Sequence, residues 1–210
     1  MKKLQIALDF TDETDALRVL RETADYIDII ECGTPLMVAC GSEIVKKVKD
    51  LYPDKEVFAD IKVVDGGAHV PESVLKAGAD IVSVLGAAEY NTIKAANDLI
   101  HQFGAKTMID LILVENLWDR VEELDGLKPD IWSVHVAYDV QGEGTSVLDE
   151  YVQIENAPGL KAIAGGIKLD TFEAACKTSA DILIVGGGLC QVDRPGETAR
   201  KMYEIIERYR

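Results

Sequence analysis

Short apolar segments recur along the chain and predict β-strands. Each is five to seven residues long, and most are rich in Val, Ile and Leu. Runs of this length that are apolar on both faces are typical of strands buried within a parallel sheet. Eight such segments occur, at residues 4–8, 27–31, 56–60, 81–85, 106–112, 131–136, 161–165 and 182–186.

Segments with helical periodicity lie between these strands. Apolar residues recur at intervals of three and four positions in residues 15–24, 43–52, 92–103 and 197–209. This spacing places apolar side chains on one face of a helix. Strand and helix are therefore expected to alternate throughout the chain.

A repeat supports the count of units. The dipeptide Asp-Ile opens an apolar run at Asp28, Asp80, Asp130 and Asp181, at separations of 52, 50 and 51 residues. This period equals two strand-helix units, and four such double units fill the chain. Composition alone can produce part of the pattern, so it supports the count without proving duplication.

Eight alternating units with buried strands predict a single (β/α)8 TIM barrel that spans residues 1–210 as one domain. An open, doubly wound sheet is the alternative. No G-x-G-x-x-G pattern follows the first predicted strand, where a dinucleotide-binding sheet has its glycine-rich turn. We therefore favour the barrel, in which catalytic residues lie at the carboxyl ends of the strands.

Charge and composition limit the possible partners. The chain has 22 basic and 37 acidic residues, and its net charge of −15 disfavours nucleic acid and anionic membranes as partners. No apolar run approaches the roughly 18 to 20 residues that cross a bilayer, and residues 1–9 are too polar for a signal peptide. We expect a cytoplasmic protein. The four cysteines have no C-x-x-C spacing, which predicts free thiols and no structural zinc.

The predicted strand ends carry an unusual set of residues. Most of the first six are ionisable and the last two are glycine, in the order Asp9, Glu31, Asp60 with Lys62, Asp110, His135, Gly165 with Gly166, and Gly186 to Gly188. A single acidic residue after a strand is commonly a helix cap, and this is the simpler interpretation of Asp9 alone. The whole ring of charges needs a cation or a ligand to offset repulsion and desolvation.

Two carboxylates in this ring suit a magnesium ion. Glu31 and Asp60 offer oxygen ligands from neighbouring strands, and Mg²⁺ commonly takes one or two carboxylates together with water and substrate oxygens. An ion pair between Glu31 and Lys62 is the alternative. Lys62 lies two residues after Asp60, so their side chains are expected to point to the same side of the strand. Asp65 follows in the next loop, where it is free to face another site or subunit.

The histidine and the glycines indicate further roles. His135 is the only one of the three histidines at a predicted strand end, which suits general acid-base chemistry, although a buried structural role is also open. His69 and His101 are expected on the solvated surface. Glycines at the last two strand ends allow close approach of backbone amides and favour phosphate binding over simple tight turns.

The segment DIKVVDGG, residues 60–67, resembles the D-x-K-x-x-D motif of the barrels related to orotidine-monophosphate decarboxylase. The likeness extends over nearly the whole chain, through LQIALD, IIECGTPL, MIDLI, VHVAYDVQ, AGGI and VGGG. Within this group the chain is most similar to the 3-hexulose-6-phosphate synthases. The 3-keto-L-gulonate-6-phosphate decarboxylases come next, but they have arginines shortly after the histidine, where this chain has Val136 and Tyr138.

This resemblance implies an activity and an assembly. The synthases add formaldehyde to ribulose 5-phosphate through an enediolate, with Mg²⁺ held by residues that match Glu31 and Asp60. The resemblance further implies a homodimer with shared active sites, in which Asp65 reaches into the site of the partner subunit. The catalytic positions are Asp9, Lys62, Asp65 and His135, and the positions that bind substrate and phosphate are Asp110, Gly165, Gly166, Gly187 and Gly188.

Two other functions remain open. The decarboxylase reaction uses the same enediolate and the same site but forms it by loss of CO₂. A barrel that binds a sugar phosphate without turning it over belongs to a different class, and the complete set of charges at the strand ends disfavours it. Ribulose-phosphate epimerase is disfavoured because it requires metal-binding histidines on early strands.

Overall fold

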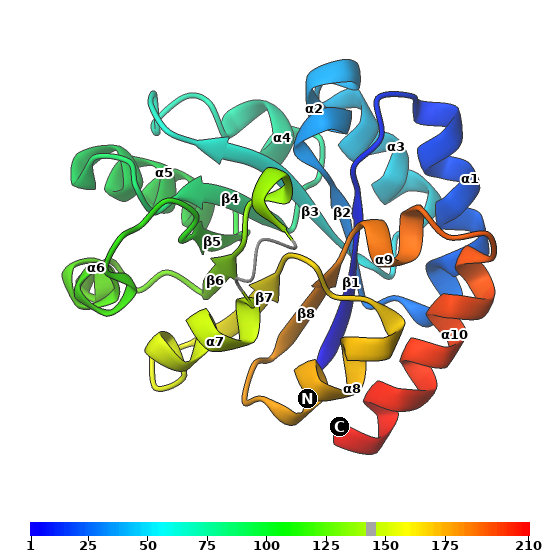
Figure 1. Cartoon of the computed structure of the whole chain (residues 1–210). Helices are drawn as coiled ribbons and strands as arrows, with labels where there is room; N and C mark the ends of the chain where they lie inside the picture. The colour runs from blue at the N-terminus through cyan, green and yellow to red at the C-terminus, as the bar shows by residue number, and fades with distance from the viewer. Residues whose placement is uncertain (142–145) are drawn as a thin grey trace.

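The computed structural model describes residues 1–141 and 146–210, which contain a closed barrel of eight parallel strands (Figure 1). Neighbouring strands pair in chain order, and β8 pairs with β1 to close the sheet. The predicted (β/α)8 barrel is confirmed, and the open sheet is excluded. The strands are β1 (Lys3–Leu8), β2 (Ile29–Cys32), β3 (Glu56–Val63), β4 (Ile81–Leu85), β5 (Lys106–Asp110), β6 (Ile131–His135), β7 (Leu160–Ala164) and β8 (Ile182–Val185).

Helices form the outer layer around the strands (Figure 1). The helix α1 begins where the side chain of Asp12 accepts hydrogen bonds from the N–H groups of Thr14 and Asp15, and α10 begins at a proline. The predicted long helices correspond to α1, α3, α5 and α10. The helices are α1 (Glu13–Thr23), α2 (Thr34–Cys40), α3 (Glu43–Leu51), α4 (Glu72–Lys76), α5 (Tyr90–Gln102), α6 (Leu117–Leu124), α7 (Val147–Tyr151), α8 (Leu169–Lys177), α9 (Gly187–Cys190) and α10 (Pro195–Ile206).

Side chains from alternate strands fill the barrel interior in layers of four, as in other barrels of this type. From the amino-terminal end upward, the layers are Ile29, Ile81, Ile131 and Ile182; then Gln5, Phe58, Met108 and Ala162; then Glu31, Ser83, Ser133 and Ile184; and finally Ala7, Asp60, Asp110 and Ala164. The interior is thus apolar at one end and polar at the other. The apolar layers supply buried area, and the polar layers place carboxylates at the mouth.

The four repeated aspartates form a ring of clamps at the amino-terminal rim of the barrel. Each carboxylate accepts the N–H of one residue on the preceding strand, and the N–H of the aspartate donates to the carbonyl of that same residue, at 2.7 to 3.2 Å. The pairs are Asp28 with Leu4, Asp80 with Val57, Asp130 with Thr107, and Asp181 with Lys161. The repeat in the sequence is therefore a repeated strand connection, far from the barrel mouth.

A short chain of charges lies at the same end. Glu56 forms ion pairs with Lys3 and with Lys106, the latter at 2.5 Å between Oε1 and Nζ. Partial burial acts to raise the pKa of Glu56, but the hydrogen bonds from Lys106 and Lys3 outweigh it and lower the pKa below its ordinary value. This network therefore favours the ionised carboxylate.

The four cysteines are free, as predicted. Burial raises the pKa of Cys32 and of Cys190 to about 12, so both remain protonated thiols. Within the described residues, no helix is both long enough and apolar enough to cross a bilayer.

Candidate active site

The strand β3 ends irregularly, and this irregularity positions Lys62. The pairing of β3 with β4 is regular at Ala59 and shifts in register before Val63. Lys62 adopts a φ of 42°, in the left-handed region that costs a residue other than glycine roughly 1–3 kcal/mol. Its backbone N–H donates to the Ser83 hydroxyl at 2.8 Å. Strained backbone of this kind often occurs at functional sites.

The Lys62 ammonium lies between two buried carboxylates. Its Nζ is 2.5 Å from Oδ2 of Asp60 and 3.5 Å from Oδ2 of Asp110. Burial acts to lower the pKa of Lys62, but the charges of Asp60 and Asp110 outweigh it and raise the pKa above its ordinary value. Lys62 is therefore a fixed positive charge at neutral pH. The prediction that Asp60 and Lys62 point to the same side of the strand agrees with this contact, although the strand between them is not regular.

His135 extends this chain of charges. Its Nδ1 lies 3.0 Å from Oδ2 of Asp110, while the N–H of Ile112 donates to the other oxygen of Asp110 at 3.0 Å. Burial acts to raise the pKa of Asp110, but the hydrogen bond with His135 and the charge of Lys62 lower it below its ordinary value. The ionised Asp110 thereby orients the imidazole, and Nε2 forms no hydrogen bond with any residue in 1–141 or 146–210. His135 is half-buried, which agrees with a role at the mouth.

Two hydroxyl groups hold Asp60 in place, and the sequence analysis did not identify them. Thr34 donates to Oδ2 of Asp60 at 2.7 Å, and Ser83 donates to Oδ1 at 2.8 Å. Both oxygens of Asp60 are therefore engaged. A signal for Ser83 did exist, because it is the single polar residue of an otherwise apolar strand.

Glu31 is a third buried carboxylate of the site, together with Asp60 and Asp110. Burial raises its pKa well above the ordinary value, and the nearby charges of Asp60 and Asp9 add to this shift. Its Oε2 accepts a hydrogen bond from Gln5 at 2.6 Å. Because Lys62 pairs with Asp60 and Asp110, the alternative of a Glu31–Lys62 ion pair is not observed. Within residues 1–141 and 146–210, Glu31 thus has neighbouring negative charge and no ion pair with a cationic side chain.

This donor set fits a hard divalent cation. No group of three or more acidic, histidine or cysteine side chains able to hold a metal is found among the described residues. Mg²⁺ does not require such a group, since one or two carboxylates suffice when water and substrate oxygens complete its shell. Added positive charge would also relieve the repulsion that raises the pKa of Glu31. The residues Glu31 and Asp60 therefore fit a magnesium site.

Asp9 lies at the mouth of the barrel, between the loops that follow β2 and β8. A Cβ built on Gly33 would lie 2.1 Å from Oδ1 of Asp9, and one built on Gly186 would lie 3.1 Å from Oδ2. Glycine at these two positions leaves room for the carboxylate. Partial burial raises the pKa of Asp9, and the charge of Asp60 raises it further. Asp9 belongs to the same electrostatic cluster as Glu31 and Asp60. The simpler interpretation of Asp9 as a helix cap is wrong, because Asp12 caps α1.

The predicted glycines allow close contact between three loops, those that follow β6, β7 and β8. Gly165 and Gly166 have φ angles of 114° and 69°, which other residues rarely adopt. A Cβ on Gly165 would lie 2.6 Å from the carbonyl of Val136, and one on Gly188 would lie 2.4 Å from the carbonyl of Ile167. Side chains at these two positions would force the loops apart. Among the described residues, a Cβ on Gly166 would first meet the side chain of Gln141 at 4.0 Å, and one on Gly187 would first meet that of Gln191 at 3.2 Å.

Other candidate residues lie outside this cluster. Asp65 is exposed, and its carboxylate accepts the N–H of Gly66 at 2.7 Å, so it does not meet the other charges within one chain. His69 is exposed, and His101 lies on α5 within 2.9 Å of the clamp residue Asp130. These two histidines therefore lie away from the site, as expected.

Comparison with known proteins agrees with this arrangement. The profile of the orotidine 5'-phosphate decarboxylase / HUMPS family matches residues 2–202. The chain belongs to this family. A 3-hexulose-6-phosphate synthase of Bacillus subtilis is 38% identical over 206 residues, which cover 97% of this chain and 98% of the relative.

Solved structures lead to the same group. A crystal structure of 3-hexulose-6-phosphate synthase from Salmonella typhimurium superimposes with a TM-score of 0.95 at 32% identity, covering 99% of this chain and 100% of the other. The 3-keto-L-gulonate-6-phosphate decarboxylase of Vibrio cholerae gives a TM-score of 0.87 at 28% identity, covering 100% and 99%. Both relatives are similar over their full length, as the motif resemblance predicts.

Proposed function

We propose that this protein is a 3-hexulose-6-phosphate synthase, which joins formaldehyde to carbon 1 of ribulose 5-phosphate. The observation that carries the proposal is the chain of contacts from Asp60 through Lys62 and Asp110 to His135. This chain sets a fixed positive charge beside a group able to transfer protons. The named relatives at 36 to 38% identity support the choice of reaction.

Phosphate recognition comes from the glycine loops in this proposal. The acidic surface disfavours an anion over most of the molecule, so local donors are required. Backbone amides of Gly165, Gly166, Gly187 and Gly188 supply such donors in this proposal, because glycine has no side chain of its own beside the N–H. Phosphate bound there leaves the other end of the sugar facing Lys62 and His135.

The side chains at the mouth of the barrel have different roles in the proposed reaction. Removing a proton from carbon 1 of the sugar places negative charge on its oxygens as the enediolate forms. The Lys62 ammonium, held by Asp60 and Asp110, stabilises that charge in place and needs no rearrangement at the moment of reaction. His135, oriented by Asp110, transfers protons to and from the substrate. Asp9 contributes to the field around the same oxygens.

A magnesium ion belongs to this proposal, with Glu31 and Asp60 as its ligands. When bound, it supplies a second positive charge next to the substrate oxygens. The buried position of Glu31 and its repulsion from Asp60 and Asp9 support a cation at this point.

A homodimer is also part of the proposal. Asp65 is exposed at the end of the D-x-K-x-x-D segment, close to the exposed side chains of Val64 and Val70. Apolar side chains exposed beside a charged loop suit a subunit contact. In the dimer, Asp65 of each chain completes the site of the other.

The direct test is consumption of formaldehyde by the purified protein with ribulose 5-phosphate, measured with Mg²⁺ and with EDTA. The proposal expects loss of formaldehyde that requires both the sugar phosphate and the metal. If formaldehyde stays constant, the synthase assignment is wrong, and CO₂ release from 3-keto-L-gulonate 6-phosphate becomes the next assay. Absence of both reactions would leave a barrel that only binds sugar phosphates.

A further inference from the structure

Gln5 is a fully buried polar side chain in an otherwise apolar layer of the barrel interior. It lies on β1, and the other members of its layer are Phe58, Met108 and Ala162. Burying an amide group costs free energy unless its atoms are hydrogen-bonded. The mechanism proposed above gives this residue no role.

One end of the Gln5 amide has a partner among the described residues, and the other end has none. Its Nε2 donates a hydrogen bond to Oε2 of Glu31 at 2.6 Å, from β1 to the neighbouring strand β2. Its Oε1 is buried and has no hydrogen-bond partner within residues 1–141 and 146–210. An apolar side chain of similar length, such as methionine, would avoid the cost of this unpaired oxygen. The contact with Glu31 is therefore what a glutamine adds at this position.

The chemistry of the contact determines which end of the amide faces Glu31. A carboxylate that binds a metal is ionised, and an ionised carboxylate only accepts hydrogen bonds. The amide NH₂ group is a donor, so it can hold one carboxylate oxygen and leave the other oxygen to a cation. Oε1 of Glu31 forms no hydrogen bond with any described residue.

The two proposed metal ligands are held by different numbers of partners. Oδ2 of Asp60 accepts hydrogen bonds from Thr34 and Lys62, and Oδ1 accepts one from Ser83. Within the part of the chain that the structure describes, Glu31 accepts a side-chain hydrogen bond from Gln5 alone. The direction of the Glu31 carboxylate thus depends on a single side chain, whereas that of Asp60 does not.

We propose that Gln5 is a positioning residue for the divalent cation: its amide holds Oε2 of Glu31, directs Oε1 toward the metal and so sets the affinity of the site. This inference rests on the magnesium site of the proposed function. Partners that orient a metal ligand in this way typically account for about 10- to 100-fold in metal affinity. Gln5 lies one layer below Glu31, so it acts through Glu31 and not on the substrate.

The experiment measures binding of Mn²⁺ alone to the purified protein, with free Mn²⁺ followed by electron paramagnetic resonance. Mn²⁺ prefers the same oxygen ligands as Mg²⁺. Gln5→Met keeps the length of the side chain, suits the apolar layer and removes the amide. We expect it to raise the dissociation constant for Mn²⁺ about 10- to 100-fold. At saturating Mg²⁺, its kcat with formaldehyde and ribulose 5-phosphate is expected to stay within about threefold of the wild type.

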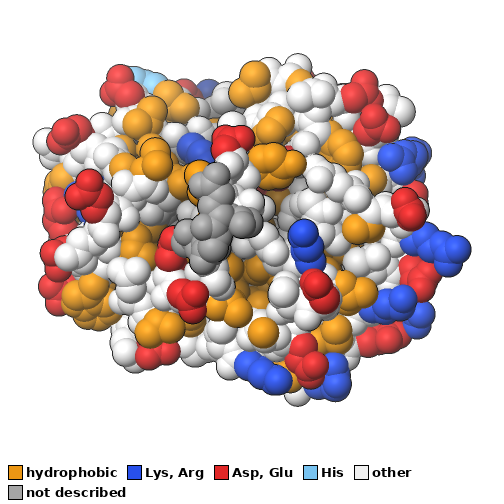
Figure 2. Space-filling model, in the orientation of Figure 1, with side chains coloured by type: hydrophobic (Ala, Val, Ile, Leu, Met, Phe, Trp, Pro, Cys, Tyr) orange, Lys and Arg blue, Asp and Glu red, His pale blue; other side chains and the backbone are white. Residues whose placement is uncertain are grey.

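Controls separate this effect from cation binding elsewhere and from altered packing. The net charge is −15, and Figure 2 shows Asp and Glu side chains spread over the visible face, so Glu31→Gln measures the background of weak sites. Met108→Leu changes the same layer without removing an amide and is expected to bind Mn²⁺ as the wild type does. Gln5→Leu replaces Gln5→Met if the latter does not fold. Added to Glu31→Gln, Gln5→Met is expected to change the remaining binding less than about twofold.

Each other outcome contradicts a defined part of the reasoning. Normal Mn²⁺ affinity in folded Gln5→Met, with weakened binding in Glu31→Gln, would overturn the inference and leave the magnesium site standing. An equal loss of affinity in Gln5→Met and Met108→Leu would also overturn it, because packing would then explain the effect. Further weakening by Gln5→Met in the Glu31→Gln background would exclude an action through Glu31. Equal binding by the wild type and Glu31→Gln would refute the metal site of the proposed function, and this inference with it.

Discussion

The substitution Glu31→Gln distinguishes two effects of Glu31: destabilisation of the fold by its buried negative charge, and stabilisation through binding of the metal. Glu31 has a pKa raised by burial and by the charges of Asp60 and Asp9, so its ionised form destabilises the folded protein. An acid whose pKa is higher in the folded than in the unfolded state loses stability as the pH rises above about 4.3, the ordinary value for Glu. Each unit of such a shift is worth about 1.4 kcal/mol. Glutamine removes the charge and can still accept the hydrogen bond from Gln5.

The expected difference in stability between Glu31→Gln and the wild type depends on whether the metal is present. In EDTA at neutral pH, Glu31→Gln is expected to be at least as stable as the wild type. With Mg²⁺ at a hundredfold excess over its dissociation constant, the wild type gains about 2.7 kcal/mol. For a domain of this size, 1 kcal/mol changes Tm by about 2–4 °C, so the gain corresponds to about 5–11 °C. The variant is expected to show almost none of this gain.

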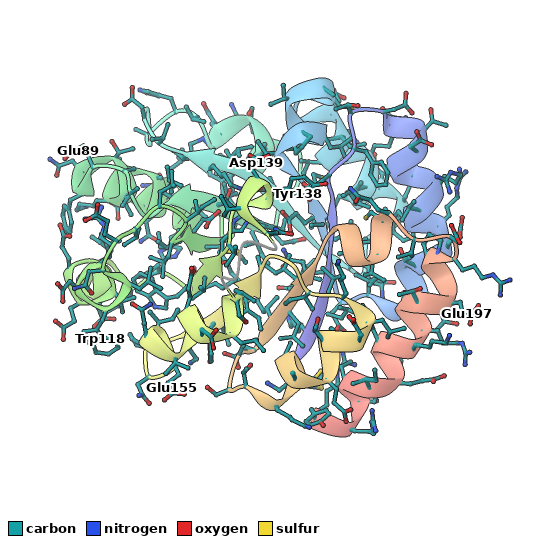
Figure 3. All side chains as sticks on the ribbon, viewed as in Figure 1. Glu89, Trp118, Tyr138, Asp139, Glu155 and Glu197 are labelled. Carbon is teal, nitrogen blue, oxygen red and sulfur yellow. The ribbon has the colours of Figure 1, made fainter. Side chains whose placement is uncertain are left out.

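Thermal unfolding followed by circular dichroism measures both effects without relying on activity. Glu155→Gln is a matched control, because Glu155 lies exposed on the outside of the barrel (Figure 3). It is expected to keep the full increase in Tm with Mg²⁺. An equal metal-dependent increase in Glu31→Gln would refute the assignment of Glu31 as a ligand. Marked destabilisation of the variant in EDTA would refute the reasoning about its buried charge.

Three further predictions concern other parts of the structure. Lys62→Ala is expected to lower kcat for the synthase reaction at least 10²-fold, because it removes a preorganised charge, and near-normal kcat in a folded variant would contradict its role. Asp80→Ala removes one clamp and is expected to cost about 1–3 kcal/mol in urea unfolding without changing KM, whereas Asp98→Ala on the exposed surface of α5 is expected to cost less than about 0.5 kcal/mol. Because the pKa of Glu56 is lowered in the fold, its contribution to stability is present above about pH 4.3 and is lost as the pH falls through the lowered value. The difference in free energy of unfolding between wild type and Glu56→Gln is therefore expected to shrink on acidification, and a constant difference would contradict this account.

The strands and their order were predictable because apolar runs and their spacing are local properties of the sequence. The site charges followed from the barrel rule that strand ends converge, which holds for Asp60, Asp110 and His135. The same rule did not predict the irregular backbone at the end of β3. The positive φ of Lys62 and the shift in register depend on contacts with Ser83 on the next strand, which no local pattern specifies.

The supporting residues show a similar limit. Gln5 and Ser83 are polar positions within apolar strands, so their inward direction could be inferred from alternation along the strand. The contact of Thr34 with Asp60 joins residues 26 positions apart and depends on how α2 begins after β2. A cavity beside His135 is lined by residues after β5, at and after the end of β6, and in α7, and no motif in the sequence indicated it. The roles of Asp65 and of the dimer stay predictions.

The clamps at the amino-terminal rim divide the barrel into quarters. Each clamp joins an odd-numbered strand to the even-numbered strand that follows it, so the fold consists of four pinned β-α-β pieces placed side by side. The two ends of the chain also meet, because the Arg210 side chain donates to the carbonyl of Lys2 at 2.9 Å (Figure 1). A circularly permuted chain that joins these ends and opens between two quarters, at residues 53–55, keeps every pinned piece whole. Opening the chain between α1 and β2 separates β1 from β2 in the sequence, although the Asp28 clamp joins these two strands. This permutation is expected to destabilise the fold more than opening at residues 53–55.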